Sequence, residues 1–210
     1  MINEQYSECK DQTKFTYLTA LESALDVFQS LRSMQTDLEQ AADLCCRALC
    51  RGNKLLVCGN GGSAAEAQHL VGELMGRYIL DRVPLPAVAL MADSALVTCI
   101  GNDYSFDDVF ARQVQGLGAS GDVLVAFSTS GNSRNIVASL SVAREKRIGS
   151  IAFLGHDGGA ARSLADHALV ISHLNTARIQ EAHQFLMHSL MDSLEQRLSC
   201  PTDLYYCAVR

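Results

Sequence analysis

The segment Val57-Cys58-Gly59-Asn60-Gly61-Gly62-Ser63 joins a short apolar run to a glycine-rich turn. The apolar run, residues 54–58, is typical of a buried strand, and the turn leads into a helix that begins at Ser63. Backbone N–H groups and the helix dipole then converge on one point, which favours an anionic ligand. His69 and Glu73 follow four residues apart, and this spacing places them on one face of the helix. The segment therefore predicts an anion site beside a pair that can bind metal or transfer protons.

Length and composition limit the classes of protein to which this chain can belong. Its 210 residues, 48% of them hydrophobic, suffice for one sizeable core, so we expect one domain. The net charge is −6, and no long basic run indicates a nucleic-acid partner. No apolar stretch reaches the roughly 20 residues of a membrane span, and the first residues lack a signal-peptide pattern. We expect a cytoplasmic protein with no membrane partner.

The spacing of the cysteines argues against a metal knuckle or a disulfide framework. They stand at positions 9, 45, 46, 50, 58, 99, 200 and 207, and none forms a C-x-x-C pair. We expect most of them to be small buried hydrophobic residues.

Periodicity divides the chain into helical and alternating parts. Apolar residues recur at three- and four-residue steps over 15–31 and 34–51, which predicts two helices suited to subunit contacts. Farther along, short apolar runs alternate with helical ones, as in a parallel sheet flanked by helices. The predicted strands are 54–58, 85–90, 122–127, 150–154 and 168–171, and the predicted helices between and after them are 106–117, 132–146 and 176–198, the last capped at Asn175. The single domain of 1–210 then comprises N-terminal helices (1–52), an α/β core with a C-terminal helix (53–198) and a tail (199–210).

A second anion cradle follows the predicted strand 122–127. The loop Ser128-Thr129-Ser130-Gly131-Asn132-Ser133 offers four hydroxyl groups and the start of a helix. A phosphate needs several donors, and this loop can supply them. A well-capped loop without a ligand is the alternative, because Ser, Thr and Asn are favoured at any helix N-terminus. Ligands of open parallel sheets gather at the carboxyl ends of the strands, so both cradles are predicted to line one crevice.

Several motifs together resemble a known family. They are Gly59-Asn60-Gly61-Gly62-Ser63, Gln68-His69, Glu73, Gly76-Arg77-Tyr78, Gly101-Asn102-Asp103, the serine loop 128–133, Arg178-Ile179-Gln180-Glu181 and His188. Over about residues 15 to 198 the chain resembles the bacterial phosphoheptose isomerases of the sugar isomerase (SIS) fold. The serine loop alone indicates only phosphosugar binding, whereas the added His, Glu, Gln and His distinguish the isomerase.

The resemblance implies a fold, an activity and a set of site residues. It implies a flavodoxin-like parallel sheet flanked by helices, a homotetramer, one Zn²⁺ per subunit and conversion of sedoheptulose 7-phosphate to glycero-manno-heptose 7-phosphate for lipopolysaccharide or other surface glycans. The implied metal ligands are His69, Glu73, Gln180 and His188, with Glu73 and His188 catalytic. The implied substrate contacts are Asn60, Gly61, Gly62, Glu73, Asn102, Asp103 and Gln180, with Ser128, Thr129, Ser130 and Ser133 on the phosphate.

The chemistry of an aldose–ketose isomerase is consistent with these residue types. Moving a carbonyl from C2 to C1 requires removal of a neighbouring proton and passage through an enediol. Glu73 can act as the base and His188 can relay a proton, while a metal can polarise the carbonyl. A nitrogen and oxygen ligand set suits Zn²⁺.

Three alternatives remain open at the level of sequence. His69 and Glu73 could form an ordinary exposed pair on a helix. Gln180 and His188 lie eight residues apart, about 12 Å along a helix, so either the helix begins after Gln180 or one of them serves a neighbouring subunit's site. The remaining residues of this helix, Glu181, His183 and Gln184, are expected to pack or be solvated. A non-catalytic SIS protein that binds the replication initiator, or senses a phosphosugar, is the competing function, although such a binder lacks the acidic residue at Glu73.

Overall fold

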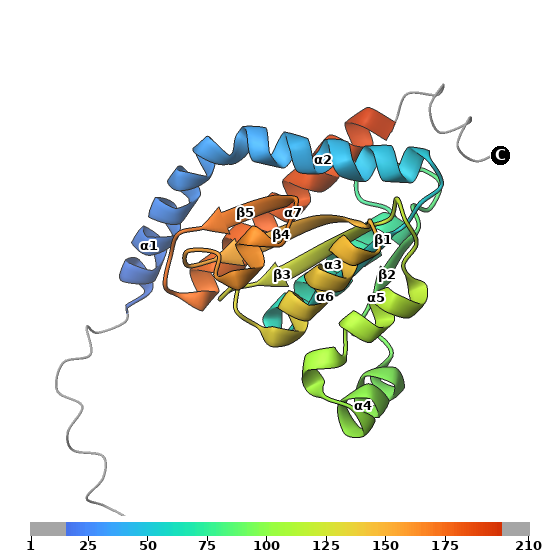
Figure 1. Ribbon diagram of the computed structural model, residues 1–210. Helices are drawn as coiled ribbons and strands as arrows, with labels where there is room; N and C mark the ends of the chain where they lie inside the picture. Colours follow the sequence, from blue (N-terminus) through green and yellow to red (C-terminus); the bar gives the residue numbers. More distant parts are fainter. Residues whose placement is uncertain (1–15, 199–210) are drawn as a thin grey trace, which may run out of the picture.

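A parallel sheet of five strands, in the order β2-β1-β3-β4-β5, forms the centre of the molecule (Figure 1). The structure, a computed structural model, describes residues 16–198. The strands are β1 (Leu55–Gly59), β2 (Ala87–Ala89), β3 (Val123–Ser128), β4 (Gly149–Gly155) and β5 (His167–Ile171). From β1 the chain moves outward to β2 and then returns to place β3 on the other side of β1. The carboxyl ends of β1 and β3 therefore flank the switch point at which such sheets bind ligands.

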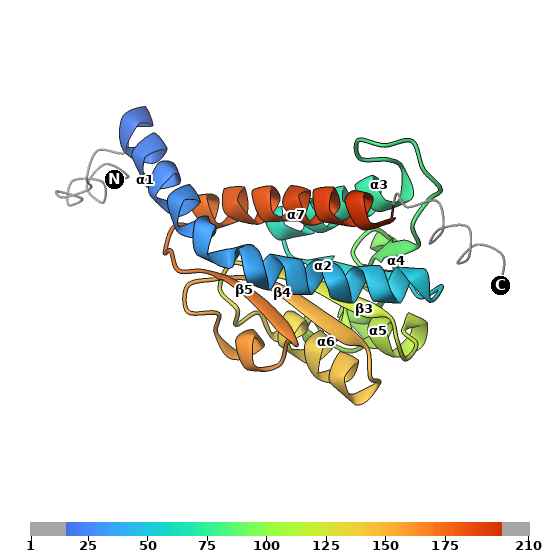
Figure 2. The ribbon, with the colours of Figure 1, turned by 90° about the horizontal axis from the view of Figure 1, so that it is seen from above.

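Helices cover both faces of the sheet (Figures 1 and 2). One layer contains α2 (Gln35–Cys50), α3 (Gly62–Met75) and α7 (Thr176–Leu198), and the other contains α4 (Ser94–Asp103), α5 (Ala111–Leu117) and α6 (Arg134–Glu145). Alternate strand residues supply the two cores: Val57 and Val125 face α2, α3 and α7, while Leu56 and Leu124 face α5 and α6. Every residue of β1 and β3 is buried, which explains why these strands read as continuous apolar runs.

The N-terminal helices have the predicted positions, except that Phe15 lies outside the described residues. α1 (Tyr17–Ser30) is capped by Thr16, whose hydroxyl accepts from Thr19 N, and a 3₁₀ turn, η1 (Leu31–Met34), leads into α2. Figure 2 shows α2 running beside α7, whereas α1 continues past the end of the sheet. This position leaves many of the large apolar side chains of α1 exposed: Tyr17, Leu18, Leu21, Leu25 and Phe28.

Two predicted boundaries were wrong for local physical reasons. The helix predicted at 106–117 is a 3₁₀ turn, η2 (Phe106–Asp108), followed by the separate α5. Ser105 starts the 3₁₀ turn, because its hydroxyl accepts from Asp107 N and its carbonyl accepts from Asp108 N, each at 3.0 Å, and α5 begins separately after Phe110, whose carbonyl accepts from Val114 N at 2.9 Å. The strand predicted at 85–90 is only Ala87–Ala89, since Pro86 has no N–H to donate to the ladder. The other predicted strands and helices are confirmed with shifts of one or two residues at some ends.

Some elements and side chains differ from expectation in other ways. The sequence patterns did not predict α4, which Asp93 caps by accepting from Leu96 N at 3.0 Å. Of the cysteines in residues 16–198, Cys45 and Cys58 are buried, Cys46 and Cys50 are half-buried and Cys99 is exposed, so burial is less general than predicted. Burial raises the pKa of the Cys45 thiol to about 12. The tail at 199–210 lies outside the described residues.

None of the described helices combines the length and the apolar content that a membrane crossing requires.

Candidate active site

The first cradle lies between β1 and α3, as the glycine-rich segment predicts. Gly61 caps α3 with a φ of 55°, a backbone conformation that side chains with a Cβ rarely adopt. Gly59 approaches the helix so closely that a Cβ there would lie 2.3 Å from Ser63 O. The two glycines therefore bring the end of β1 against the first turn of α3. The first N–H groups of a helix can face an anion.

The second cradle is the serine loop between β3 and α6. Ser128 Oγ accepts from Gly131 N at 3.1 Å and lies 3.4 Å from Ser133 Oγ. Ser130 Oγ accepts from Asn132 N, also at 3.1 Å. Thr129 and Ser130 are half-buried, and Ser133 caps α6 without a side-chain hydrogen bond to the helix. Hydroxyl groups and a helix start thus gather where the sequence predicts a phosphate.

One pair of amides joins the two cradles. Asn60 of the first loop and Asn135 of α6 exchange two hydrogen bonds, each 2.9 Å long. Because β1 and β3 are neighbours in the sheet, this pair bridges the switch point directly. The two loops are therefore neighbours, as the predicted shared crevice requires, and Asn135 is a contributor that the sequence patterns did not indicate.

His69 and Glu73 of α3 and His188 of α7 form a cluster where the two helices meet, next to the first cradle. His69 Nε2 lies 3.0 Å from Glu73 Oε1. One ligand atom from each of the three residues lies within 4.8 Å of the others. The His69 and His188 rings meet edge to face, with centroids 5.1 Å apart. His69 and Glu73 are therefore more than an exposed helix pair, because a third group from a distant part of the chain joins them.

Gln184 belongs to this cluster, contrary to the expectation that it only packs or is solvated. Its Nε2 lies 2.9 Å from His69 Nδ1 and 3.1 Å from His188 Nε2. Glu73 as a carboxylate can only accept, so His69 Nε2 donates to it and the Nδ1 of neutral His69 accepts from Gln184. The four-residue step from Gln184 to His188 was the sequence signal that could have identified it.

Gln180 lies on α7 at the first cradle. α7 begins at Thr176, capped by Asn175, so the alternative that the helix begins after Gln180 is wrong. A Cβ at Gly62 would lie 2.3 Å from Gln180 Nε2, which means that this amide rests against the first turn of α3. Gln180 and His188 thus serve different parts of one surface: the first approaches the anion cradle and the second the His69–Glu73 pair.

A buried pair lies beneath this surface. His183 is fully buried, its Nε2 donates to Leu154 O at 3.1 Å, and its Nδ1 lies 3.8 Å from Glu66 Oε2. Its ring packs near Phe127 and Phe153, with centroids 6.1 Å from each. The expectation of a packing role for His183 is confirmed. These contacts connect α7, α3 and the end of β4 under the cluster.

Asn102 and Asp103 stand apart from this layer. They end α4, and Asn102 Nδ2 donates to Asp103 Oδ1 at 2.8 Å with both side chains exposed. α4 packs on the opposite face of the sheet from α7, through Ile100. The structure therefore does not bring these two predicted substrate contacts together with His69, Glu73 and His188.

The donor set of the cluster fits a divalent metal. Two imidazoles and one carboxylate, with ligand atoms so close together, match the nitrogen and oxygen ligands that Zn²⁺ takes in catalytic sites. Such sites have three protein ligands and leave a position for water or substrate. His69, with 42% of its side chain exposed, and Glu73, with 20%, can be reached from solvent.

Comparison with known proteins is consistent with this geometry. The SIS domain family matches residues 16–155. The phosphoheptose isomerase of Citrifermentans bemidjiense is 50% identical over 161 residues, which cover 77% of this chain and 84% of that protein.

Two solved structures of phosphoheptose isomerases have the same fold. The one from Neisseria gonorrhoeae is 40% identical with a TM-score of 0.81, covering 85% of this chain and 96% of its own. The one from Francisella tularensis is 36% identical with a TM-score of 0.83, covering 87% and 100%. The fold therefore has a close counterpart in enzymes of this type, and the chain belongs to the phosphoheptose isomerases of the SIS-domain family.

Proposed function

We propose that this isomerase converts sedoheptulose 7-phosphate to glycero-manno-heptose 7-phosphate through an enediol. The observation that carries the proposal is the cluster of His69, Glu73 and His188, which lies on helices that meet beside the first cradle. A base next to an anion site is what an isomerase of phosphorylated sugars needs. The phosphate fixes the substrate, and the base meets the carbon next to the carbonyl.

The two cradles divide the binding of the substrate between them. The serine loop, with Ser128, Thr129, Ser130 and Ser133, offers hydroxyl donors for the phosphate. Asn60, Gly61 and Gly62 offer an amide and the first turn of α3 to the sugar, together with Gln180. Asn102 and Asp103 lie on the other face of the sheet, so we assign their contacts to the site of a neighbouring subunit.

Proton transfer falls to Glu73 and His188. Glu73 removes a proton from C1 of the ketose, the C1–H electrons form the enediol double bond, and the proton is returned at C2. His188 relays the proton that moves between the two substrate oxygens. His69 donates to Glu73 at 3.0 Å and so keeps the carboxylate oriented. Gln184 holds both imidazole rings from the other side.

His69, Glu73 and His188 would hold a Zn²⁺ ion, whereas Gln180, the fourth ligand that the resemblance implies, lies at the first cradle and is assigned to the sugar. The ion, when bound, polarises the substrate carbonyl and stabilises negative charge on its oxygens. The protein groups supply the rest of the chemistry, namely anchoring, orientation and proton movement.

We also propose a biosynthetic role, a compartment and an assembly for the enzyme. Its product would enter the synthesis of activated heptose for lipopolysaccharide or another surface glycan. A charged phosphosugar crosses a lipid bilayer at a high energetic cost, so we place the reaction in the cytoplasm. We further propose a homotetramer, because the apolar side chains exposed on α1 need a covering surface.

Chelation tests the metal part of this proposal. Removing metal should abolish turnover, and added Zn²⁺ should restore it. Equilibrium dialysis with elemental analysis should give one Zn²⁺ per subunit in the wild type and a loss of binding in His69→Ala. Full activity in protein shown to be metal-free would contradict the proposed ligand set.

A further inference from the structure

One buried carboxylate binds the segment that connects α3 to β2, residues 76–86. Glu195 of α7 has a side chain that is only 4% exposed. Its Oε2 accepts from Ile79 N at 3.2 Å and from Leu80 N at 2.9 Å, and its Oε1 accepts from Arg82 Nε at 3.1 Å. A single side chain thus holds two backbone groups and one guanidinium of this segment.

Arg82 links Glu195 to α3, the helix that carries Glu73. Its side chain is 7% exposed, and its guanidinium donates to Glu73 O at 2.6 Å and to Leu74 O at 2.9 Å. These carbonyls belong to the last turn of α3, where the helix itself supplies no partner. The cation therefore fixes the backbone of the residue whose carboxylate is the proposed base.

The same segment also touches the other side of the cluster. The Tyr78 ring stacks on His188, with centroids 5.7 Å apart and planes at 24°. Burial, and after it the neighbouring Asp192 carboxylate, raises the pKa of the Tyr78 hydroxyl, which stays protonated. One connection thus contacts Glu73 through Arg82 and His188 through Tyr78.

We propose that Arg82 and Glu195 are positioning residues for the isomerase reaction, which set the place of the Glu73 carboxylate relative to His188. This inference rests on the proposed role of Glu73. A buried ion pair contributes little net stability compared with apolar packing, whereas its directed hydrogen bonds define one geometry. A base displaced by about 1 Å can cost on the order of a hundredfold in rate. The pair acts through α3 and does not touch substrate in this scheme.

Arg82→Lys and Glu195→Gln test the proposal in the full chain. Lysine keeps the charge but has no planar fork to reach both carbonyls and Glu195 together. Glutamine keeps the shape but turns part of the acceptor into a donor. We expect kcat to fall about tenfold or more in each variant, with KM for the phosphosugar within about threefold, because the phosphate contacts are on other loops. The double variant should lose little beyond either single change.

Arg197→Gln is the matched control. Arg197 also lies on α7, two residues from Glu195, and its ion pair with Asp43 is partly exposed. We expect this variant to keep wild-type kcat and KM. Arg82→Ala adds a second readout, since millimolar guanidinium should restore part of its kcat by occupying the vacated space, whereas sodium chloride should not.

The outcomes separate this inference from the proposed function. All rates are divided by the number of sites that bind a phosphosugar, so that unfolded protein does not count. Wild-type kcat per site in both Arg82→Lys and Glu195→Gln, or no guanidinium rescue, overturns the positioning role. Glu73→Gln is measured alongside: if it remains active, the role of Glu73 fails, whereas an inactive Glu73→Gln with fully active Arg82→Lys refutes only the positioning role.

Discussion

At the scale of single residues, hydrogen bonding fixes which atoms of the cluster carry protons. Glu73 as a carboxylate accepts from His69 Nε2, so the other nitrogen of neutral His69 faces the Gln184 amide as an acceptor. The second amide hydrogen of Gln184 can then reach His188 Nε2. This chain of contacts keeps the Glu73 carboxylate oriented, as a base requires.

Substitution by alanine should have different effects at two glycines of the first cradle. The three atoms nearest to a Cβ at Gly62 all belong to the end of the flexible Gln180 side chain, which can move. Gly62→Ala should therefore keep the free energy of unfolding within about 1 kcal/mol of the wild type while raising KM, because Gln180 is displaced. Gly59→Ala meets the Ser63 backbone and should lose about 2 kcal/mol or more. Denaturant unfolding and steady-state kinetics on both variants check this, and equal stability losses would contradict it.

The role of a residue could be predicted from the sequence where its contacts are local. His69 and Glu73 could be predicted because four residues on a helix bring them onto one face. Gln184 has the same relation to His188, and its role was missed although the signal was present. Glu195 and Arg82 could not be identified from sequence, since they are more than a hundred residues apart and only the packing of α7 against the 76–86 segment unites them.

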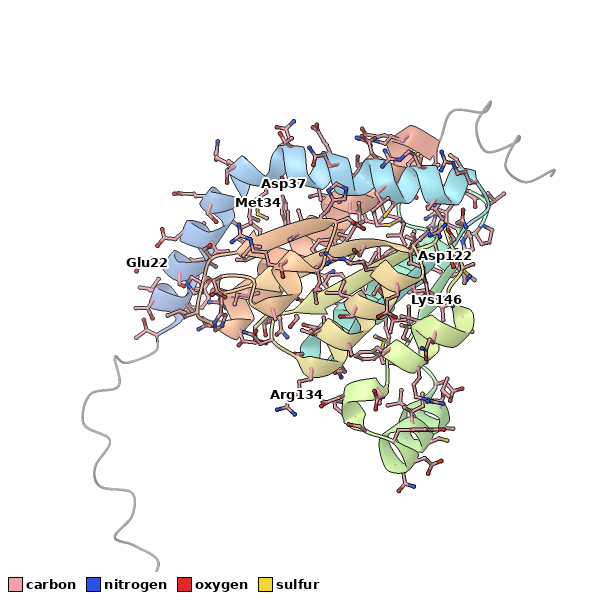
Figure 3. All side chains as sticks on the ribbon, viewed as in Figure 1. Glu22, Met34, Asp37, Asp122, Arg134 and Lys146 are labelled. Carbon is pink, nitrogen blue, oxygen red and sulfur yellow. The ribbon has the colours of Figure 1, made fainter. Side chains whose placement is uncertain are left out.

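At the scale of elements, Asp122 joins the starts of β1 and β3, at the amino ends of the strands (Figure 3). Its carboxylate accepts from Lys54 Nζ at 2.6 Å, Lys54 N at 3.0 Å and Ala119 N at 2.8 Å. Burial by itself would raise the pKa of Asp122, but these hydrogen bonds outweigh it and the pKa lies below its usual value. The folded protein therefore stabilises the ionised form of Asp122.

This lowered pKa predicts how stability depends on pH. The contribution of Asp122 is present above the unfolded-state pKa of about 3.9 and is lost as the pH falls through the lower folded-state value. Asp122→Asn should cost about 2 kcal/mol at pH 7, and its difference from wild type should shrink below about pH 4. Urea unfolding from pH 7 to pH 3 measures both. A difference that does not change with pH would contradict the assignment.

The elements themselves were predictable to different degrees. α7 has the predicted bounds, Thr176–Leu198, because an Asn cap and a long apolar stripe define it. The helix predicted at 106–117 is a 3₁₀ turn followed by a separate α5, because the hydroxyl of Ser105, just before it, accepts from Asp107 N and starts a tighter turn that the apolar period does not show. α4 was missed because it is short and buries only Ile100 among its residues.

In the molecule as a whole, α1 has more apolar surface than the contacts within one subunit cover. Leu25 is 54% exposed and Leu18 is 64% exposed, whereas Val27 is buried. Leu25→Asp should therefore split the proposed tetramer and lower activity with it, and Asp26→Asn, a change of charge at an exposed position on another face of the same helix, should do neither. Sedimentation and activity measured on the same samples check this. A fully active monomer would remove both the tetramer and the assignment of Asn102 and Asp103 to a neighbour's site.

Assembly is the level that the sequence of one chain defines least. Periodicity shows that α1 has an apolar stripe, and the single-chain structure shows that the stripe is uncovered. Neither identifies the surface that covers it, because complementarity between two copies depends on shapes that no local pattern encodes.

In the proposed reaction, Glu73 starts an enediol isomerisation of sedoheptulose 7-phosphate. The most direct measurement incubates wild-type protein and Glu73→Gln with this substrate in D₂O and follows both by NMR. The wild type should form the aldose phosphate, and Glu73→Gln should bind the substrate within about tenfold of wild type yet form no product and exchange no deuterium into C1. Bound but unchanged substrate in the wild type, or exchange at the wild-type rate in Glu73→Gln, would contradict the claim.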